Sequence, residues 1–321
     1  MMRVFVYEHL SGAASADADA DADDELLEAG LAMRDAVVRD LLRVGDCAVS
    51  VAAGVRAPAG PAAARTIRRP PDASAVDFVA DQATQHDRVW VVAPETGGVL
   101  GRLHRAVGPG RWLGCGVDAI ALASSKHATL AHAAGHGLLT PHGFAAAPQT
   151  ARWVVKPDDG AGALATRVHA TLAAARDDLQ RRRERGEAAV LEPWVAGEPL
   201  SLSLLCSAGS VELLSVNRQQ IGIDAAGVLS FDGVAVNTLP RDAARFATLY
   251  AWAQSLGRAL PGLRGYVGVD LVWHAQRGPV LIEVNPRVTM AYVGLSDALD
   301  RNLAAAVLAA HDHREPLHAC A

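Results

Sequence analysis

The sequence predicts an α/β protein in which a doubly wound N-terminal domain precedes an α+β region. In the first part of the chain, short apolar runs rich in β-branched residues alternate with helix-length amphipathic segments, the order of a parallel sheet covered by helices. Farther on, apolar runs are joined in pairs by short turns, which favours antiparallel hairpins. The 321 residues leave room for two or three such units, and half of the residues are hydrophobic, enough for a core.

The N-terminal elements follow one another in a regular order. Strands are predicted at 3–7, 47–51 and 89–92, helices at 26–42, 75–84 and 99–107, and a loop rich in Pro, Ala and Gly at 54–71. Residues 13–24, AASADADADADD, are acidic and low in complexity, so we expect a solvated loop there. The segment PETGG at 94–98 comes directly after a buried strand, at the carboxyl end where open α/β sheets bind ligands.

Composition and charge narrow the classes of function. The formal net charge of −5 argues against a general nucleic-acid binder, whose surface would be basic. No apolar run approaches the ~18 residues that a transmembrane helix requires, and the N-terminus lacks the apolar core and cleavage site of a signal peptide. The four cysteines are far apart and without CxxC spacing, which is typical of a reducing compartment. We therefore expect a cytoplasmic protein with no membrane and no nucleic-acid partner.

Two lysines are candidate anion-binding groups. A helix is expected to begin at Lys126, with one of the two preceding serines as its N-cap. The next strand carries Lys156 and leads into a loop of small residues at 158–163. Successive backbone N–H groups of such a loop can hold phosphate oxygens, although an ordinary turn fits the pattern equally well. The loop residues concerned are Asp159, Gly160 and Gly162.

Residues 189–198 predict a strand and a turn suited to the edge of a flat heterocycle. The strand ends at Glu192, a proline follows, and Val195 adds apolar surface before a turn that contains Glu198. The other elements predicted in this half are a charged helix at 171–187, hairpin strands at 200–205 and 211–216, and helices at 243–260 and 302–311. The polar run 217–220 is expected at the hairpin's end, where a strand-lined site would place ligand groups.

A hairpin over 266–287, YVGVDLVWHAQRGPVLIEVNPR, concentrates the chemistry of the chain. Because side chains alternate along a strand, Asp270, Glu283 and Asn285 can converge on one face of this hairpin. Two carboxylates and an amide oxygen suit Mg²⁺, which keeps waters and takes further ligands from substrate phosphates. Arg287, a fork donor for phosphate or carboxylate, follows. The alternative is structural: Asp270 caps a strand end and Glu283 pairs with Arg287.

The order of these features resembles the ATP-grasp superfamily of carboxylate–amine ligases over essentially the whole chain. The resemblance implies an ATP-grasp fold, with a pre-ATP-grasp domain at 1–120, a small subdomain with a phosphate-binding flap at 121–197 and a C-terminal subdomain at 198–321. It also implies ATP with Mg²⁺ or Mn²⁺. By this resemblance, Lys126 and Lys156 would contact the phosphates or adenine, and 158–163 would be the flap over the triphosphate. Glu192 and Val195 would contact adenine, and Glu198 lies in the turn that carries the acidic residue for the ribose. The metal would be bound by Asp270, Glu283 and Asn285.

Within the superfamily, several stretches look like the archaeal tyramine–L-glutamate ligases of methanofuran biosynthesis and their bacterial relatives. These stretches are FVYEHLSG, LLEAGLAM, VVAPETGG, VNRQ and IEVNPRVTMAYVGL. The resemblance implies a ligase that joins glutamate to an amine such as tyramine or tyrosine through an acyl phosphate, in a cofactor pathway of one-carbon metabolism. Another amino acid or a peptide as substrate, nucleotide binding without catalysis, and a phosphotransferase stay open, as does a homodimer.

The resemblance also implies roles in the reaction. The catalytic groups are Arg287, Lys156 and Arg218, and further substrate contacts are Tyr292 and the loop 95–98. Two positions depart from related families. Ser125 stands where superfamily members often have Asp, and Gly268 stands where D-alanine–D-alanine ligases have Arg. The oxyanion role therefore falls to Arg287.

Overall fold

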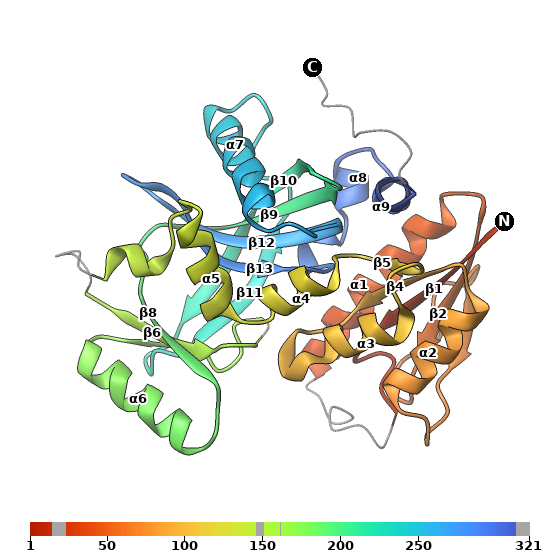
Figure 1. The fold of residues 1–321 in the computed structure, drawn as a ribbon, viewed down its shortest axis with the longest axis horizontal. Coiled ribbons are helices and arrows are strands. Elements are labelled where there is room, and N and C mark those ends of the chain that lie inside the picture. The colour runs from red at the N-terminus through yellow and green to blue at the C-terminus, as the bar shows by residue number, and fades with distance from the viewer. Residues whose placement is uncertain (15–23, 146–150, 161, 313–321) are drawn as a thin grey trace.

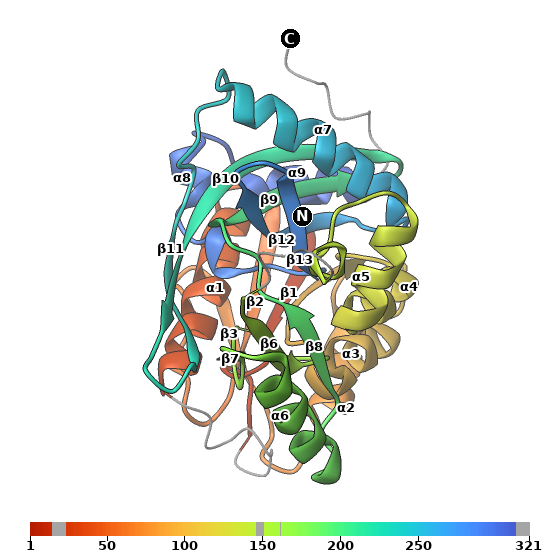
Figure 2. The same ribbon diagram turned by 90° about the vertical axis from the view of Figure 1, so that its left-hand side faces the viewer.

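The computed structural model describes residues 1–14, 24–145, 151–160 and 162–312, so most of the acidic stretch at 13–24 lies outside the described residues. The elements form three sheets with helices packed on their faces (Figure 1). Figure 2, turned by 90°, shows the smallest sheet and helix α6 below the largest sheet.

The first sheet is the parallel, doubly wound unit that the sequence predicts. Its strand order is β3-β2-β1-β4-β5, and every pair is parallel. Helix α1 covers one face, where Val4 and Val6 pack, and α2 and α3 cover the other face, where Phe5 and Tyr7 pack. The bounds are β1 Met2–Glu8, β2 Cys47–Ala53, β3 Arg65–Arg68, β4 Arg88–Val92, β5 Trp112–Leu113, α1 Asp24–Leu42, α2 Ala75–Gln85 and α3 Val99–Val107.

Three segments of this part of the chain differ from the prediction, and the shortest is the unpredicted two-residue strand β5. The sequence predicts a loop at 54–71, but Arg65–Arg68 form the edge strand β3. This strand has four residues, three of them polar, and so lacks the apolar alternation that would reveal it. Helix α4 (Val117–Ala123) was not predicted, and its seven residues are too few for a clear helical period.

The second sheet is small and antiparallel, with the order β7-β6-β8. Its strands are β6 (Trp153–Pro157), β7 (Arg167–His169) and β8 (Ala189–Pro193), and helix α6 (Leu172–Glu184) packs on one face. Since His169 contacts Asp178 of α6, strand alternation places Lys156 and Glu192 on the opposite face. Helix α5 (Lys126–Gly135) and the 3-10 turn η2 (Pro141–Phe144) precede this sheet.

The third sheet carries the predicted hairpin and is antiparallel, with the order β11-β10-β9-β12-β13. Helix α7 packs on one face, against leucines of β9 such as Leu202, and the other face packs through Leu205 and Tyr266 toward α9. The bounds are β9 Glu198–Ser207, β10 Ser210–Ile223, β11 Leu229–Ala235, β12 Gly265–His274, β13 Gly278–Asn285, α7 Ala244–Ala259, η3 Met290–Tyr292, α8 Leu295–Ala298 and α9 Leu303–His311.

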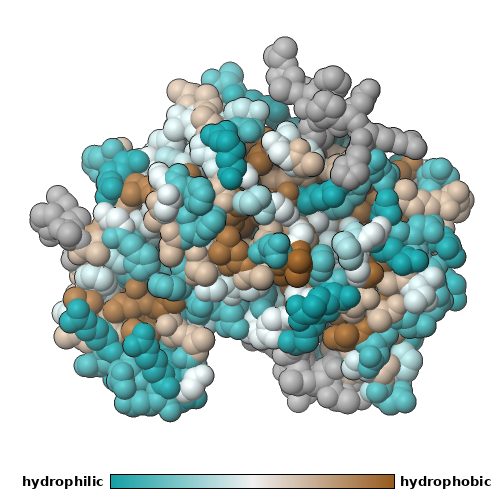
Figure 3. Space-filling view, viewed as in Figure 1, coloured by the Kyte–Doolittle hydropathy of each residue, from teal (hydrophilic) through white to brown (hydrophobic). Residues whose placement is uncertain are grey.

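The polar run 217–220 does not end a hairpin as predicted. It lies inside β10, which continues to Ile223 and pairs with the unpredicted strand β11. The surface of the molecule is notched between the lobe that carries α6 and the N-terminal domain (Figure 3). Among the described residues, no helix combines the length and the apolar character that a membrane crossing demands.

Candidate active site

The three predicted metal ligands lie on one face of the β12–β13 hairpin. Asp270 stands opposite Glu283, and Gly268 stands opposite Asn285. The Asn285 Nδ2 donates to Asp270 Oδ2 at 3.1 Å. Position 268 has no room for a side chain, because a Cβ there would lie 2.4 Å from the Thr289 Cγ2. The side-chain oxygen atoms of Asp270, Glu283 and Asn285 therefore lie close together, as the spacing in the sequence predicts.

The electrostatics of this set favour a cation. Burial raises the pKa of Asp270 to about 7, and the neighbouring Glu283 carboxylate raises it as well. The Lys126 Nζ lies 3.0 Å from Glu283 Oε1 and supplies one positive charge. Two close carboxylates and an amide oxygen are a donor set for Mg²⁺ or Mn²⁺, with waters and phosphate oxygens as the other ligands. No group of three or more His, Cys, Asp or Glu suited to a metal occurs among the described residues.

The structural alternative for this hairpin does not hold. Asp270 lies within β12 rather than at its end, and it accepts a second hydrogen bond from Gln219 Nε2 at 2.9 Å. Glu283 pairs with Lys126, whereas Arg287 pairs with Glu95. Gln219 was missed as a site residue, although it belongs to the polar run that the sequence singled out.

The start of α5 is tied to the loop after β6. Ser125 is the N-cap, as predicted for one of the two serines, and its Oγ accepts from the backbone N–H of Ala128 at 3.1 Å. The Asp158 carboxylate accepts from the Ser125 Oγ and from the backbone N–H of residue 127, both at 2.8 Å. The Lys126 Nζ donates to the carbonyl oxygen of Gly160. Lys126 thus lies between the 158–160 loop and Glu283.

A buried ion pair joins the two neighbouring strands of the small sheet. The Lys156 Nζ lies 2.9 Å from Glu192 Oε2, and both side chains are less than a tenth exposed. The other carboxylate oxygen of Glu192 is buried and has no hydrogen-bond partner among the described residues. Leaving such an oxygen unpaired costs free energy, so this atom calls for a donor. Val195 is buried nearby and packs with Phe144 and Val280.

Arg287 is bound by the N-terminal domain. Its Nε and Nη2 donate to the carboxylate of Glu95 at 3.0 to 3.2 Å, and Glu95 is only 3% exposed. The loop that carries Glu95 also contacts the loop after β6, because Asp159 Oδ2 accepts from the backbone N–H of Gly97 at 2.9 Å. The Thr96 Oγ1 donates to the carbonyl oxygen of Asp159 at 3.1 Å. Residues 95–97 therefore contact both Arg287, which follows β13, and the loop after β6.

Three residues with predicted roles lie elsewhere. Arg218 and Glu198 form an ion pair at 2.9 Å on the face of the large sheet that α7 covers, and Arg245 of α7 also contacts Glu198. Since Gln219 contacts Asp270, alternation along β10 places Arg218 away from the carboxylates. Tyr292 is 1% exposed, and its hydroxyl donates to Asp40 at 2.8 Å inside the core. The structure thus does not bring these three side chains to the metal face.

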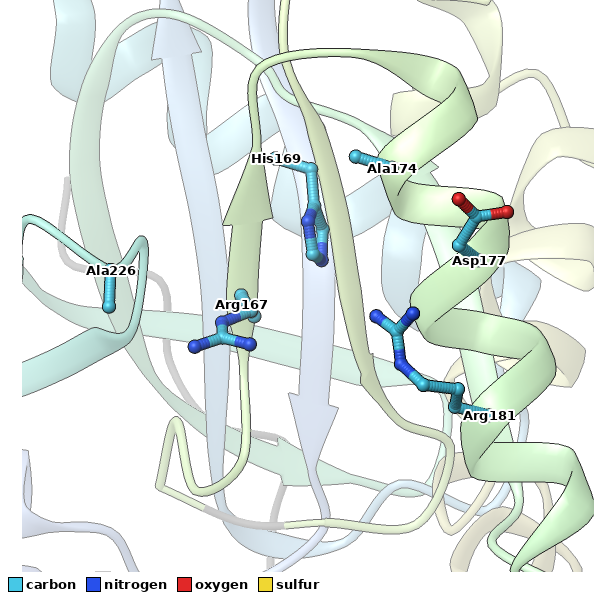
Figure 4. Close-up of a pocket in the computed structure, with 6 residues that line it drawn as sticks. All are labelled: Arg167, His169, Ala174, Asp177, Arg181 and Ala226. Carbon is cyan, nitrogen blue, oxygen red and sulfur yellow. The ribbon is translucent and has the colours of Figure 1, made fainter.

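A basic hollow of about 380 Å³ lies on the outer face of the small sheet, where α6 packs (Figure 4). Its lining residues are Arg167 and His169 of β7, Ala174, Asp177 and Arg181 of α6, and Ala226 at the tip of the β10–β11 hairpin. Lys156 and Glu192 face the other side of this sheet, so the hollow is separate from the candidate active site.

Family models match most of the chain. One described as an ATP-grasp domain matches residues 123–291, and one described as a pre ATP-grasp 3 domain matches residues 47–120. No curated protein matches the sequence.

Solved structures share the fold at low sequence identity. An ATP-grasp superfamily protein from Archaeoglobus fulgidus is 20% identical with a TM-score of 0.68, and the match covers 96% of this chain and 88% of that one. A D-alanine–D-alanine ligase from Bacillus anthracis is 15% identical with a TM-score of 0.66, covering 98% of each chain. An L-amino acid ligase from Bacillus licheniformis is 16% identical with a TM-score of 0.60, covering 92% and 74%.

These likenesses agree with the observed architecture, in which a doubly wound parallel domain precedes a small and a large antiparallel sheet. They confirm the predicted fold. Because the ATP-grasp match spans more than half of the residues, the chain belongs to the ATP-grasp family, with an N-terminal pre-ATP-grasp domain.

Proposed function

We propose that the protein is an ATP-dependent, ADP-forming ligase that joins a carboxylate to an amine. The observation that carries this proposal is the convergence of Asp270, Glu283 and Asn285 on one sheet face, with Lys126 against Glu283. Two of the solved structures with this fold are named as ligases of amino acids, which supports the same reaction type.

The metal face fits a divalent cation better than any monovalent partner. Asp270 and Glu283 together carry up to two negative charges, and Lys126 supplies only one positive charge. Asp270, Glu283 and Asn285 would hold Mg²⁺ or Mn²⁺ there, and the cation would neutralise negative charge on the phosphates of ATP. Gln219 and the amide of Asn285 hold the Asp270 carboxylate in place by donating to its two oxygens.

Lys126 has two roles in this proposal, one with and one without ligands. In this structure it neutralises Glu283 and donates to the Gly160 carbonyl. A metal at Glu283 would release the ammonium group, which lies beside the 158–160 loop and can then contact a phosphate. Metal and nucleotide binding are therefore expected to be cooperative, because a metal at Glu283 frees the Lys126 ammonium group to bind a phosphate.

The adenine end of the nucleotide is assigned to the small sheet. The unpaired Glu192 oxygen is a buried acceptor that an exocyclic amine would satisfy, and Lys156 holds the other oxygen. Val195 adds an apolar wall. Asp159, Gly160 and Gly162 belong to the loop between β6 and β7, which would cover the phosphates.

The chain's own contribution to the reaction is positioning and neutralisation of charge. The substrate carboxylate attacks the γ-phosphorus of ATP, giving an acyl phosphate and ADP. The amine then attacks the acyl carbon, and inorganic phosphate leaves with the electrons of the broken C–O bond. Lys126 and Lys156 offset charge on the nucleotide, and Arg287 lies beside Asn285 at the metal face.

The finer proposal names glutamate as the acid and tyramine or tyrosine as the amine, in methanofuran- or methylofuran-type cofactor biosynthesis. Its support is the set of sequence stretches that look like tyramine–L-glutamate ligases. Two of them meet in the structure, because VVAPETGG contains Glu95 and IEVNPRVTMAYVGL contains Arg287.

The test mixes the protein with Mg-ATP, glutamate and tyramine or tyrosine, and follows ADP and product mass. A γ-glutamyl adduct formed with one ADP per amide is the expected result. D-alanine and a panel of L-amino acids replace the substrates in parallel, and Asp270→Asn is the inactive control. ADP formation with no need for an amine, together with a stable phosphorylated acid, would indicate a phosphotransferase. Nucleotide binding with no turnover on any pair would leave a binding protein.

A further inference from the structure

The guanidinium group of Arg287 has few donors left for a ligand. Arginine carries five N–H donors. The Nε and one Nη2 hydrogen face the Glu95 carboxylate, the Nη1 donates to the carbonyl oxygen of Val288 at 3.1 Å, and the Nη2 also approaches Asn285 Oδ1 at 3.5 Å. Four of the five N–H groups thus have acceptors within the protein.

This arrangement changes what Arg287 can do. A free guanidinium offers two parallel N–H groups and binds a carboxylate or phosphate as a fork. Glu95 occupies that fork, so Arg287 has one N–H left on Nη1. A single directed donor suits a developing oxyanion, whereas it is a poor clamp for a whole carboxylate.

The pair is also rigid and crosses between domains. Glu95 is 3% exposed, the Arg287 side chain is 11% exposed, and the two residues are separated by 192 positions in sequence. Glu95 follows β4 of the N-terminal domain, while Arg287 follows β13 of the large sheet. Opening such a pair leaves a buried charge without compensation, so the pair stays closed in the folded protein.

We propose that Glu95 is a positioning residue of the pre-ATP-grasp domain, which closes the Arg287 fork and leaves one N–H beside the metal face for the acyl-transfer oxyanion. The kinetic test of this proposal rests on the proposed ligase function, because it requires turnover of a substrate pair. Because Thr96 and Gly97 contact Asp159, the same loop sets the place of the flap relative to Arg287. The N-terminal domain therefore takes part in the geometry of the reaction site.

A double-mutant cycle tests whether Glu95 acts through Arg287. Turnover is measured for Glu95→Ala, Arg287→Ala and the double variant, with the substrate pair found for the wild type. Each single variant is expected to lose on the order of 10²-fold in kcat, the scale of one lost oxyanion donor. The double variant is expected to lose no more than Arg287→Ala, and the KM for ATP to stay within about twofold. Additive losses, or unchanged turnover in Glu95→Ala, would overturn the proposal.

Two further variants separate positioning from folding. Glu95→Gln keeps the shape of the side chain and removes only the negative charge that holds the guanidinium group. This variant replaces Glu95→Ala if Glu95→Ala does not fold. Glu212→Gln is the control, because it breaks the ion pair that Glu212 of β10 makes with Arg301. Glu212 pairs with Leu205, whereas Asp270 pairs with Ser201, four residues away along β9. This control is expected to retain kcat, and a loss equal to that of Glu95→Gln would indicate a general effect of ion-pair removal.

A second measurement does not depend on turnover. Inorganic phosphate is titrated calorimetrically into protein saturated with Mg²⁺ and the analogue AMP-PNP. Glu95→Ala frees the two N–H groups of Arg287 and is expected to bind phosphate about tenfold more tightly than the wild type. The double variant lacks the guanidinium group and is expected to show no such increase. Equal affinities in the wild type and Glu95→Ala would overturn the closed fork. If no substrate pair turns over, the ligase proposal fails while this titration still decides the role of Glu95.

Discussion

The two faces of the large sheet carry the same residue types in different circumstances. On the face toward the N-terminal domain, Asp270, Glu283 and Asn285 are close together, and Arg287 is buried against Glu95. On the face toward α7, Arg218 and Glu198 also form an ion pair, but the Arg218 side chain is 60% exposed. An exposed pair is screened and contributes little, whereas a buried pair fixes geometry. Chemistry on this sheet is thus decided by which face a side chain takes.

The largest expected effect comes from the metal face itself. Asp270→Asn removes one carboxylate from the proposed metal site while keeping its hydrogen-bonding shape. Metal-ion stabilisation of transition-state charge amounts to several kcal/mol, so kcat/KM is expected to fall on the order of 10³-fold or more. The measurement is ADP release at saturating ATP over a range of Mg²⁺ concentrations. A variant that turns over within tenfold of the wild type would remove the metal role from this face.

The same substitution is expected to stabilise the metal-free protein. Burial beside Glu283 raises the pKa of Asp270 to about 7 in the folded state, above its ordinary value of 3.8. The unfolded chain loses this proton at lower pH than the folded chain, so the free energy of unfolding falls as pH rises from about 4 to 7, and is then level. At pH 8 without metal, Asp270→Asn is expected to be more stable by about 2 to 4 kcal/mol.

Urea unfolding with EDTA at pH 5 and pH 8 measures this effect. The advantage of the variant is expected to grow with pH, and Mg-ATP is expected to stabilise the wild type alone. An advantage that does not change between pH 5 and pH 8 would mean that Asp270 titrates normally in the folded protein.

The metal face was predictable because its residues are close in sequence. Asp270, Glu283 and Asn285 lie on two strands joined by a short turn, and alternation puts Glu283 and Asn285 on one face of the second strand. A register shift between Asp270 and Leu271 then sets Asp270 opposite Glu283. The ion pair between Arg287 and Glu95 was not predictable, since the two residues are 192 positions apart and only the fold brings them together. The doubly wound domain was predictable from its apolar strands, and β3 was not, because it is short and polar.

Alternation fails where a strand is irregular. The register of β10 shifts between Leu213 and Ser215 and again between Gln220 and Ile221. Each β-bulge moves the following side chains to the other face, so counting along the sequence cannot say whether Arg218 or Gln219 faces the carboxylates. The structure shows that it is Gln219.

A smaller and two-sided effect is expected from Lys126→Ala. Without the ammonium group, Glu283 is free for a cation, so Mg²⁺ alone is expected to bind about tenfold more tightly. ATP is expected to bind about tenfold more weakly, because a charge near the phosphates is lost. Calorimetric titrations with Mg²⁺ alone and with Mg-ATP measure the two changes. Weaker binding of both ligands would mean that Lys126 only stabilises the fold of the site.

The smallest expected effect is that of Arg218→Ala, which tests the comparison of the two faces directly. Arg218 contacts Glu198, and Arg245 of α7 contacts the same carboxylate, so the variant leaves Glu198 with a partner. Loss of an exposed ion pair is expected to cost less than about 1 kcal/mol of stability and to change kcat/KM by less than about threefold. Gln219→Leu, one residue along the strand, is the contrasting variant, because it removes a donor from Asp270. If Arg218→Ala loses more activity than Gln219→Leu, the α7 face takes part in the reaction, and the catalytic role predicted for Arg218 from the sequence stands after all.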